Sequence, residues 1–174
     1  MENRWHAGWP VRLAATAAFG LALLLGLHQK AYAFSGEGEG TTDSPFIIQT
    51  AAQLNEMRNN LTADYRLGAD IDLSGYTRWD PIGPWGTAFE GTLDGDGHTI
   101  SNLTITGTAN NLGLFGYVSD AEIRNLGLIN VNVQGTSFVG GLVGYMFGSK
   151  IENTYVTGLV AGTDNVGGLA GYVS

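Results

Sequence analysis

Apolar positions in the second half of the chain recur at a fixed spacing. The string Gly-Leu-x-Gly-Tyr occurs at residues 113–117, 141–145 and 168–172, with offsets of 28 and 27 residues. A recurrence of this period is typical of supersecondary units that stack on one another. The pattern therefore predicts a solenoid, in which each repeat buries its apolar face only against its neighbours.

A second string, Ile-x-Asn, occurs at residues 100–102, 123–125 and 151–153. Past its asparagine the apolar positions change phase by one residue, and a strand pattern survives such a shift only if the chain turns a corner. Asparagine tolerates the left-handed backbone conformation that a sharp corner needs. We therefore expect Asn102, Asn125 and Asn153 to lie above one another and to share side-chain amide hydrogen bonds.

Short strands separated by corners and repeated every 25 to 28 residues predict an all-β fold, a parallel β-helix. It should be right-handed, because parallel crossover connections are strongly biased to that hand. The first repeat fits the scheme if Gly91 corresponds to Gly116, with a two-residue insertion in residues 94–97. Residues 88–174 then form the β-helix repeats, and because the last repeat stops before its own Ile-x-Asn corner, we expect the solenoid to be truncated at the C-terminus.

Residues 45–87 are expected to form an N-terminal cap. Thr50 is a candidate N-cap for a helix over residues 51–60 whose apolar side chains share one face. A solenoid needs such a cover, since an open terminal coil exposes both its core and its strand edges. Residues 65–73 follow, and their strict apolar–polar alternation predicts a strand with one buried face.

The first 33 residues have the pattern of a secretory signal peptide. Arg4 and Arg12 precede or border an apolar run over residues 13–27, and Ala31-Tyr32-Ala33 is a cleavage signature, so we expect cleavage after Ala33. An uncleaved membrane anchor is the alternative, although the run is shorter than the ~20 residues that cross a bilayer. Glycine, serine and acidic residues in 34–44 predict a flexible linker.

Composition narrows the function classes. The chain has 27 glycines and 44% hydrophobic residues, which argues against disorder, and it has no cysteine for a disulfide, thiolate ligand or nucleophile. The net charge of −8 becomes −10 once residues 1–33 are removed. This charge disfavours nucleic acid and anionic membranes as partners, so we expect contact with a membrane only through the signal peptide.

The combination of Gly-Gly-Leu-Val-Gly-Tyr at residues 140–145 with Ile-Glu-Asn-Thr-Tyr-Val-Thr-Gly at 151–158 resembles the GLUG repeat family, named for its Gly-Leu-any-Gly motif. The resemblance extends over residues 45–174 and implies an extracellular or cell-surface bacterial protein with a β-helical stalk or adhesive surface. Some members of that family also carry a zinc peptidase domain that cleaves immunoglobulin A. Its His-Glu-x-x-His motif is absent from this chain, so any peptidase would lie beyond Ser174.

Acidic pairs are the best candidates for chemistry. Glycoside hydrolysis needs two carboxylates that flank one bond, and Asp94 with Asp96, or Asp70 with Asp72, have suitable spacing. In a glycine-rich turn, however, the first pair more simply marks turn residues, and the second alternates outward on its strand. Calcium at Asp94 and Asp96 is a weaker candidate, since the twelve-residue loop and closing glutamate of a calcium hand are missing. We expect no catalytic residue, other metal or cofactor, and we expect His98 to bond the turn.

Aromatic residues supply the candidate binding positions. The loop over residues 74–87 contains Tyr76, Trp79 and Trp85, which could either stack on sugar rings or pack beneath the cap. Tyr117, Tyr145 and Tyr172 recur with the repeat and should form a stacked ladder, whose direction, inward or outward, the pattern leaves open.

The sequence thus favours a secreted or cell-surface β-helical module for adhesion or display, without a catalytic site of its own. Its partners would be an extracellular carbohydrate or a protein of a host or cell surface. The alternative is the N-terminal part of a larger extracellular enzyme, a polysaccharide hydrolase, a lyase or a surface zinc peptidase, whose active residues lie beyond Ser174.

Overall fold

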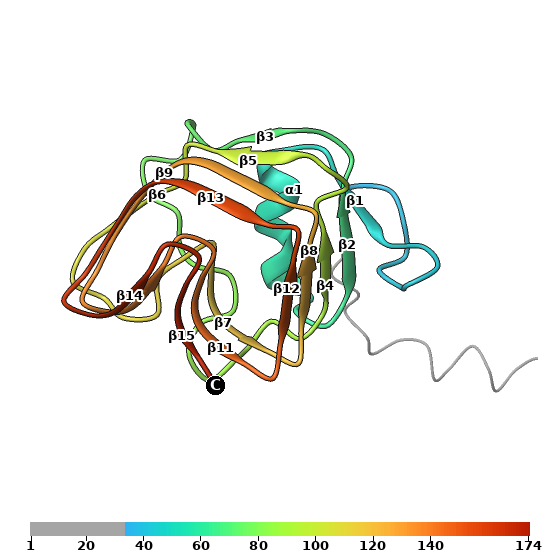
Figure 1. Cartoon of the computed structure of the whole chain (residues 1–174). Helices are drawn as coiled ribbons and strands as arrows, with labels where there is room; N and C mark the ends of the chain where they lie inside the picture. The colour runs from blue at the N-terminus through green and yellow to red at the C-terminus, as the bar shows by residue number, and fades with distance from the viewer. Residues whose placement is uncertain (1–33) are drawn as a thin grey trace, which may run out of the picture. The chain divides into compact units, whose positions relative to one another are not determined.

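The structure, a computed structural model, describes residues 34–174, and the predicted signal peptide lies outside them. These residues form short parallel strands stacked coil upon coil, with one helix near the N-terminal end (Figure 1). The predicted all-β parallel solenoid with a short N-terminal helix is confirmed. No helix among residues 34–174 is long and apolar enough to cross a membrane.

The strands fall into three main sheets and one smaller pair, each with its strands in coil order. The first sheet contains β1 (Phe46–Ile48), β2 (Asp64–Leu67), β4 (Thr92–Asp94), β8 (Glu122–Arg124) and β12 (Lys150–Glu152). The second contains β3 (Ile71–Asp72), β5 (Thr99–Ser101), β9 (Gly127–Gln134) and β13 (Tyr155–Ala161), and β6 (Thr104–Thr106) also pairs with β9. The third contains β7 (Phe115–Ser119), β11 (Val143–Phe147) and β15 (Ala170–Val173), and the smaller pair is β10 (Ser137–Gly140) with β14 (Asp164–Gly167).

The two sequence motifs stack as expected in the last three coils. Tyr145 pairs with Tyr117 on one side and with Tyr172 on the other, and Ile151 pairs with Ile123. These registers place equivalent residues 28 or 27 positions apart, as the motif spacing predicts. The hydrophobic repeat therefore sets the strand register directly, because a slip of one residue would turn every buried side chain to the surface.

The predicted alignment of the first repeat is wrong. Ile123 pairs with Leu93 and not with Ile100, and the strand position opposite Phe115 is taken by Ile82. Ile100 lies one sheet further on, opposite Leu128. Gly91 therefore does not correspond to Gly116. The misalignment arose because the early coil lacks the Gly-Leu-x-Gly-Tyr string and its connections are longer. The apolar residues around Ile100 therefore fitted the repeat spacing in place of those around Leu93.

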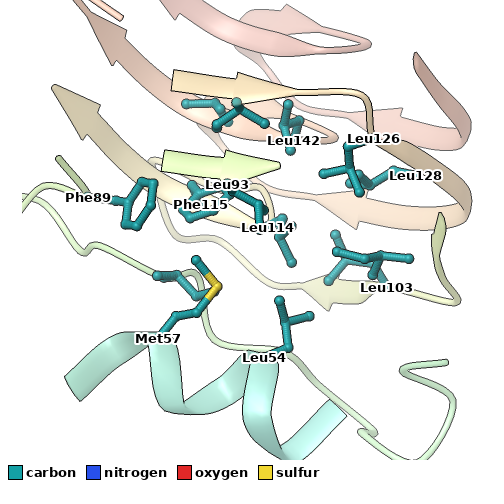
Figure 2. Packing of buried hydrophobic residues seen from close by; sticks show 14 of the residues in the cluster. Leu54, Met57, Phe89, Leu93, Leu103, Leu114, Phe115, Leu126, Leu128 and Leu142 are labelled. Carbon is teal, nitrogen blue, oxygen red and sulfur yellow. The ribbon is translucent and has the colours of Figure 1, made fainter. Parts of the chain in front are cut away.

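The N-terminal cap forms through a capping box. The Thr50 hydroxyl accepts a hydrogen bond from the Gln53 amide, and the Gln53 side chain accepts one from the Thr50 amide in return. The α-helix α1 (Ala51–Glu56) continues as a 3-10 turn (Met57–Asn59), which matches the predicted helix. Leu54 and Met57 are fully buried and point into the coils (Figure 2), so the helix closes this end of the core.

The predicted strand over residues 65–73 is split into β2 and β3 around Gly68, but its alternation holds. Tyr65, Leu67, Ile71 and Leu73 are all buried. The interruption lets the chain turn from the first sheet into the second. The apolar pattern therefore gave the buried face correctly and missed the corner within it.

The segment over residues 34–44, for which composition predicts a flexible linker, is bonded to the first coils. The Ile47 amide donates to the Glu37 carbonyl at 2.8 Å, and the Asp64 amide donates to the Gly40 carbonyl at 3.0 Å. Phe34 packs against Phe46, with 4.6 Å between ring centroids. The segment thus follows the outer edge of β1, and only long-range contacts that composition does not reveal hold it there.

One core runs through the described coils, and no polar or charged residue is buried in it. Its layers are mostly leucine, isoleucine and valine, with Phe89 and Phe115 in contact at 4.9 Å between ring centroids (Figure 2). The repeat glycines allow this core to form where the chain turns inward at β14 before returning along β15 (Figure 1). A Cβ built on Gly171 would lie 2.4 Å from the Val139 nitrogen, so only glycine permits β15 to approach β10 this closely.

Candidate binding surface

Side-chain ladders fix the two outer corners of the coil. In the first ladder the Asn153 amide nitrogen donates to the Asn125 side-chain oxygen at 3.2 Å, and the Asn125 amide donates to Asp94 at 3.0 Å. Both asparagines have positive φ, as a corner requires. The structure thus brings two of the three expected asparagines together, with an aspartate at the start of the row.

The third expected asparagine belongs to a different ladder. Asn102 donates to Asp72 at 2.7 Å and accepts from Asn130 at 2.6 Å. It does not lie on Asn125, because the coil that carries it is in register with Leu128 and not with Ile123. The sequence reasoning did not assign Asn130 to a ladder, although its positive φ gives it the same corner role. Its signal was the second phase change in that repeat.

An outward-facing row of aromatic side chains follows the third sheet. Tyr117, Tyr145 and Tyr172 are absent from the core and partly exposed, and this settles the direction that the sequence left open. Tyr145 stacks on Tyr172 with 4.9 Å between centroids and meets Tyr117 edge to face at 5.5 Å. We call this row, together with Trp85 and Phe138, the aromatic row.

Trp85 begins the aromatic row and is its most exposed member, with 63% of its surface accessible. Its indole lies 5.3 Å from the Tyr117 ring and 5.2 Å from the Tyr145 ring, measured between centroids. At the other side of the row Phe138 lies 5.7 Å from both Tyr145 and Tyr172. Phe138 was missed by the sequence reasoning; its positive φ, unusual for a bulky residue, turns its ring outward from β10.

The three candidates in the loop over residues 74–87 separate in space. Trp79 is 1% exposed and packs in the core, where Tyr76 meets it edge to face at 5.1 Å. Its Nε1 has no hydrogen-bond partner among the described residues. Trp85 is the most exposed of the three and Tyr76 is partly buried, so the loop contributes both to the core and to the surface.

Arg58 positions this loop from the helical cap. Its guanidinium donates to the Pro81 carbonyl at 2.8 Å and to the Asp80 carbonyl, and its carbon lies 5.1 Å from the Trp79 ring centroid. Burial lowers the pKa of Arg58, although the nearby Asp80 opposes the shift. Arg58 thus joins the helical cap to residues 79–81 of the loop.

The acidic pairs are engaged in structural bonds. Arg124 Nε lies 2.8 Å from Asp94, and the Asp96 backbone amide donates to the same carboxylate at 2.9 Å. Burial raises the pKa of Asp94, but hydrogen bonds from Asp96, Asn125 and Arg124 outweigh it and lower the pKa below the ordinary value. Because these donors occupy its oxygens, the Asp94 carboxylate holds its own turn together and accepts the first hydrogen bond of the asparagine ladder.

Asp70 and Asp72 point outward and cap the turns of the second sheet. The Thr99 amide donates to Asp70 at 2.8 Å, and His98 Nδ1 lies 3.3 Å from the same oxygen. Hydrogen bonds lower the pKa of both aspartates, first from the Thr99 backbone for Asp70 and from the Asn102 side chain for Asp72. No group of three His, Asp or Glu in residues 34–174 is placed to hold a metal ion. Calcium binding at Asp94 and Asp96 stays an untested prediction.

A polar depression of about 430 Å³ lies on the outside of the first sheet. Three of the charged side chains that line it are paired with one another, because Arg124 bridges Asp94 and Glu122 at 2.8 and 2.9 Å. The residues that line it are Thr42, Asp43, Pro45, Asp64, Tyr65, Arg66, Thr92, Asp94, Glu122 and Arg124. The aromatic row, whose apolar side chains are exposed to solvent, is therefore the better candidate for binding.

The chain is similar to parts of two much larger proteins. It is 41% identical over 143 residues to Halomucin of Haloquadratum walsbyi, and 39% identical over 135 residues to a "Putative Gly-rich membrane protein" of Evansella cellulosilytica. The alignments cover 72% and 71% of this chain but only 2% and 15% of those proteins. The chain therefore spans a small fraction of the length of either relative.

Among solved structures, the fold matches that of a "putative immunoglobulin A1 protease" from Bacteroides ovatus. The TM-score is 0.53 at 22% identity, over 79% of this chain and 64% of that one, which establishes a shared fold. The family model for the N-terminal region of M26 IgA1-specific metallo-endopeptidases matches residues 49–158. This match covers well over half of the sequence, and the chain belongs to that family.

Proposed function

We propose that this chain is a non-catalytic β-helical module of a larger secreted or cell-surface protein, and that the aromatic row is its contact surface for a neutral carbohydrate. The observation that carries the proposal is Trp85, an indole with 63% exposure that packs against Tyr117 and Tyr145. An exposed aromatic cluster of this kind marks an interaction site more often than a chance feature of the surface. We also propose that the chain is related to the GLUG repeat family and that residues 1–33 are a signal peptide.

A carbohydrate suits the row better than a charged ligand. The three strands beneath it, β7, β11 and β15, contain no charged residue. A neutral sugar ring offers an apolar face to an aromatic ring and hydroxyl groups to the surrounding water, so neither side has to bury a charge. The net charge of −8 further disfavours nucleic acid, whose bases would otherwise also stack on such rings.

The solenoid repeats the aromatic contact from one coil to the next, so the contact surface extends along the axis. Adjacent parallel strands lie about 4.8 Å apart, so one aromatic side chain per coil produces a line of contacts along the axis. Each contact is weak, and several in line add to a useful affinity without a deep pocket. This arrangement favours adhesion to an extended polymer.

The test is a titration of the purified chain with soluble neutral oligosaccharides, using cello-, xylo-, manno- and chito-hexaose as probes. Trp85 is the exposed tryptophan of residues 34–174 and Trp79 the buried one, so a ligand on the row should change the fluorescence that comes from Trp85. Trp85→Ala should weaken binding at least 10-fold, which is about 1.4 kcal/mol. Phe147→Ala removes another exposed aromatic side chain from outside the row and should change the affinity less than twofold.

Failure of all four probes to bind would contradict the carbohydrate assignment, and equal losses in both variants would contradict the row as the site.

The second candidate function is the non-catalytic N-terminal part of a peptidase. It is favoured by the family match to an N-terminal region of metallo-endopeptidases. Detection of a His-Glu-x-x-His domain in the same polypeptide would favour it over a module of a non-catalytic surface protein.

A further inference from the structure

One position beside the aromatic row has a left-handed backbone in three successive coils. Phe138 lies opposite Asn111 in the coil before it and opposite Asn165 in the coil after it, as the pairing of β10 with its neighbours shows. The φ angles of these three residues are 55°, 55° and 52° in chain order. The chain therefore makes the same sharp turn at this position in each coil.

Phe138 is the exception in this column by residue type. Nine non-glycine residues of the range 34–174 have a positive φ, and the other eight are asparagine or aspartate. Asparagine and aspartate enter this conformation because their short polar side chains bond locally, whereas a bulky side chain crowds the backbone. The backbone at position 138 therefore favours asparagine, and phenylalanine destabilises it.

The Phe138 ring does not offset this cost by packing in the core. It is partly exposed, and within residues 34–174 it belongs neither to the buried cluster nor to the apolar side chains that pack against that cluster. Its aromatic contacts are Tyr145 and Tyr172, each 5.7 Å away between centroids. Strained residues of this kind cluster at functional sites. The position of the ring therefore points to a role in binding and not in folding.

A second departure from the repeat brings Trp85 to the same place. Residues 83–88 stand opposite residues 116–117, six residues against two, so the earlier coil has an insertion here. None of residues 83–88 belongs to the buried cluster, and a Cβ on Gly86 would meet nothing within 4 Å. The insertion therefore adds nothing to the core, and the side chain that it brings to the row is the Trp85 indole.

Both departures place an aromatic ring against Tyr145. The Trp85 ring lies 5.2 Å from it at an interplanar angle of 79°, and the Phe138 ring lies 5.7 Å from it at 68°. The repeat accounts for Tyr145, which pairs with Tyr117, but it accounts for neither of the other two rings. Three partly exposed rings at steep angles to one another suit a ligand with apolar surface on more than one side, such as a single sugar ring.

We propose that Phe138 is a ligand-binding residue of the aromatic row, and that Phe138 and Trp85 form, together with Tyr145, a subsite for one neutral sugar unit. The inference rests on the proposed function and deepens it, because it separates the rings that serve the ligand from the tyrosine ladder that the repeat supplies. Removal of the Phe138 ring should then weaken binding without weakening the fold.

Phe138→Asn in the full chain separates these two effects. Its melting temperature should stay within about 2 °C of the parent or rise, because asparagine suits the left-handed backbone. Isothermal titration calorimetry uses whichever of cello-, xylo-, manno- and chito-hexaose binds the parent most tightly, and the affinity should fall about 10-fold or more. Phe138→Tyr keeps the ring and should keep the affinity within about twofold.

Phe147→Asn is the matched control. Phe147 is an aromatic residue with 47% exposure that lies outside the row, and its φ is not positive. This variant should keep the affinity of the parent. It should also melt at a lower temperature than Phe138→Asn, because asparagine is disfavoured at an ordinary strand position.

A double variant tests whether the two rings share one ligand unit. Trp85→Ala combined with Phe138→Asn should weaken binding by less than the product of the two single effects, because both rings contact the same sugar. A double effect equal to that product would overturn the shared subsite.

Two further results would overturn the inference while leaving the proposed function in place. One is a Phe138→Asn variant whose affinity falls no further than that of Phe147→Asn. The other is a Phe138→Asn variant that melts more than about 2 °C below the parent, since the ring would then serve the fold. If no hexaose binds the parent, the proposed function fails and the subsite fails with it.

Discussion

Gly144→Ala tests the reason why the Gly-Leu-x-Gly motif exists. A Cβ at Gly144 would lie 2.4 Å from the Asn111 carbonyl carbon, and 2.6 Å from both the Asn111 Cα and the Leu112 nitrogen. All three are backbone atoms, so no side chain can rotate away. Gly144 has no positive φ, and the cost of alanine therefore comes from close approach and not from backbone conformation.

The magnitude follows from the separation that alanine would require. Moving the two segments to ordinary contact, at least 3.4 Å, demands about 1 Å of displacement. This would strain the bond from the Leu112 amide to the Phe138 carbonyl (3.0 Å) and the bond from the Gly140 amide to the Leu112 carbonyl (2.8 Å). Overpacking costs about 1–3 kcal/mol, and the stiffer unfolded chain returns about 0.4–1 kcal/mol. Because the clash is with backbone atoms, we take the upper part of this difference and expect a net loss of about 2 kcal/mol.

Thermal and urea unfolding followed by circular dichroism measure this loss. For a domain of this size, 2 kcal/mol corresponds to a fall of roughly 7 °C in melting temperature. Gly75→Ala is the matched control, because a Cβ there meets nothing within 4 Å and its φ is not positive. If Gly144→Ala melts at or above the temperature of Gly75→Ala, close backbone approach is not the reason for the motif glycine.

Three further variants test the ladders and the cap. Asn125→Leu should lower the free energy of unfolding in urea by about 2–4 kcal/mol, because it removes two hydrogen bonds and places a bulky residue at positive φ. Asn125→Gly should lower it less. A leucine variant as stable as the parent would exclude a stabilising role for the ladder. Because the pKa of Asp94 is lowered in the folded state, its contribution is full above its unfolded pKa of about 3.9 and is lost as the pH falls through the folded value. Asp94→Asn should therefore be less stable at pH 7 with a flatter decline between pH 5 and 2, and a decline as steep as that of the parent would contradict this role. Arg58→Ala should cost about 1–3 kcal/mol and change the near-ultraviolet dichroism of Trp79, and an unchanged spectrum would mean that the loop is held by other contacts.

The sequence by itself determined the solenoid, its period and its capped end. Motif spacing placed Tyr145 on Tyr117 and Ile151 on Ile123, and the N-cap candidate Thr50 with the apolar face that follows it located the helix. These features are local or strictly periodic, so they can be read from residue order alone. Where the period broke, in the coil that carries Asn102, the predicted alignment failed.

Only the tertiary structure decided which aromatic residues lie outside and which polar residues bond one another. Trp79 and Trp85 lie six residues apart in the same loop, yet one is buried and the other is 63% exposed. The inward turn of the chain against β10 also lies beyond the sequence pattern, because it depends on the approach of Gly171 to Val139, two residues 32 positions apart. Such choices are set by packing between coils, which the residue order limits but does not specify.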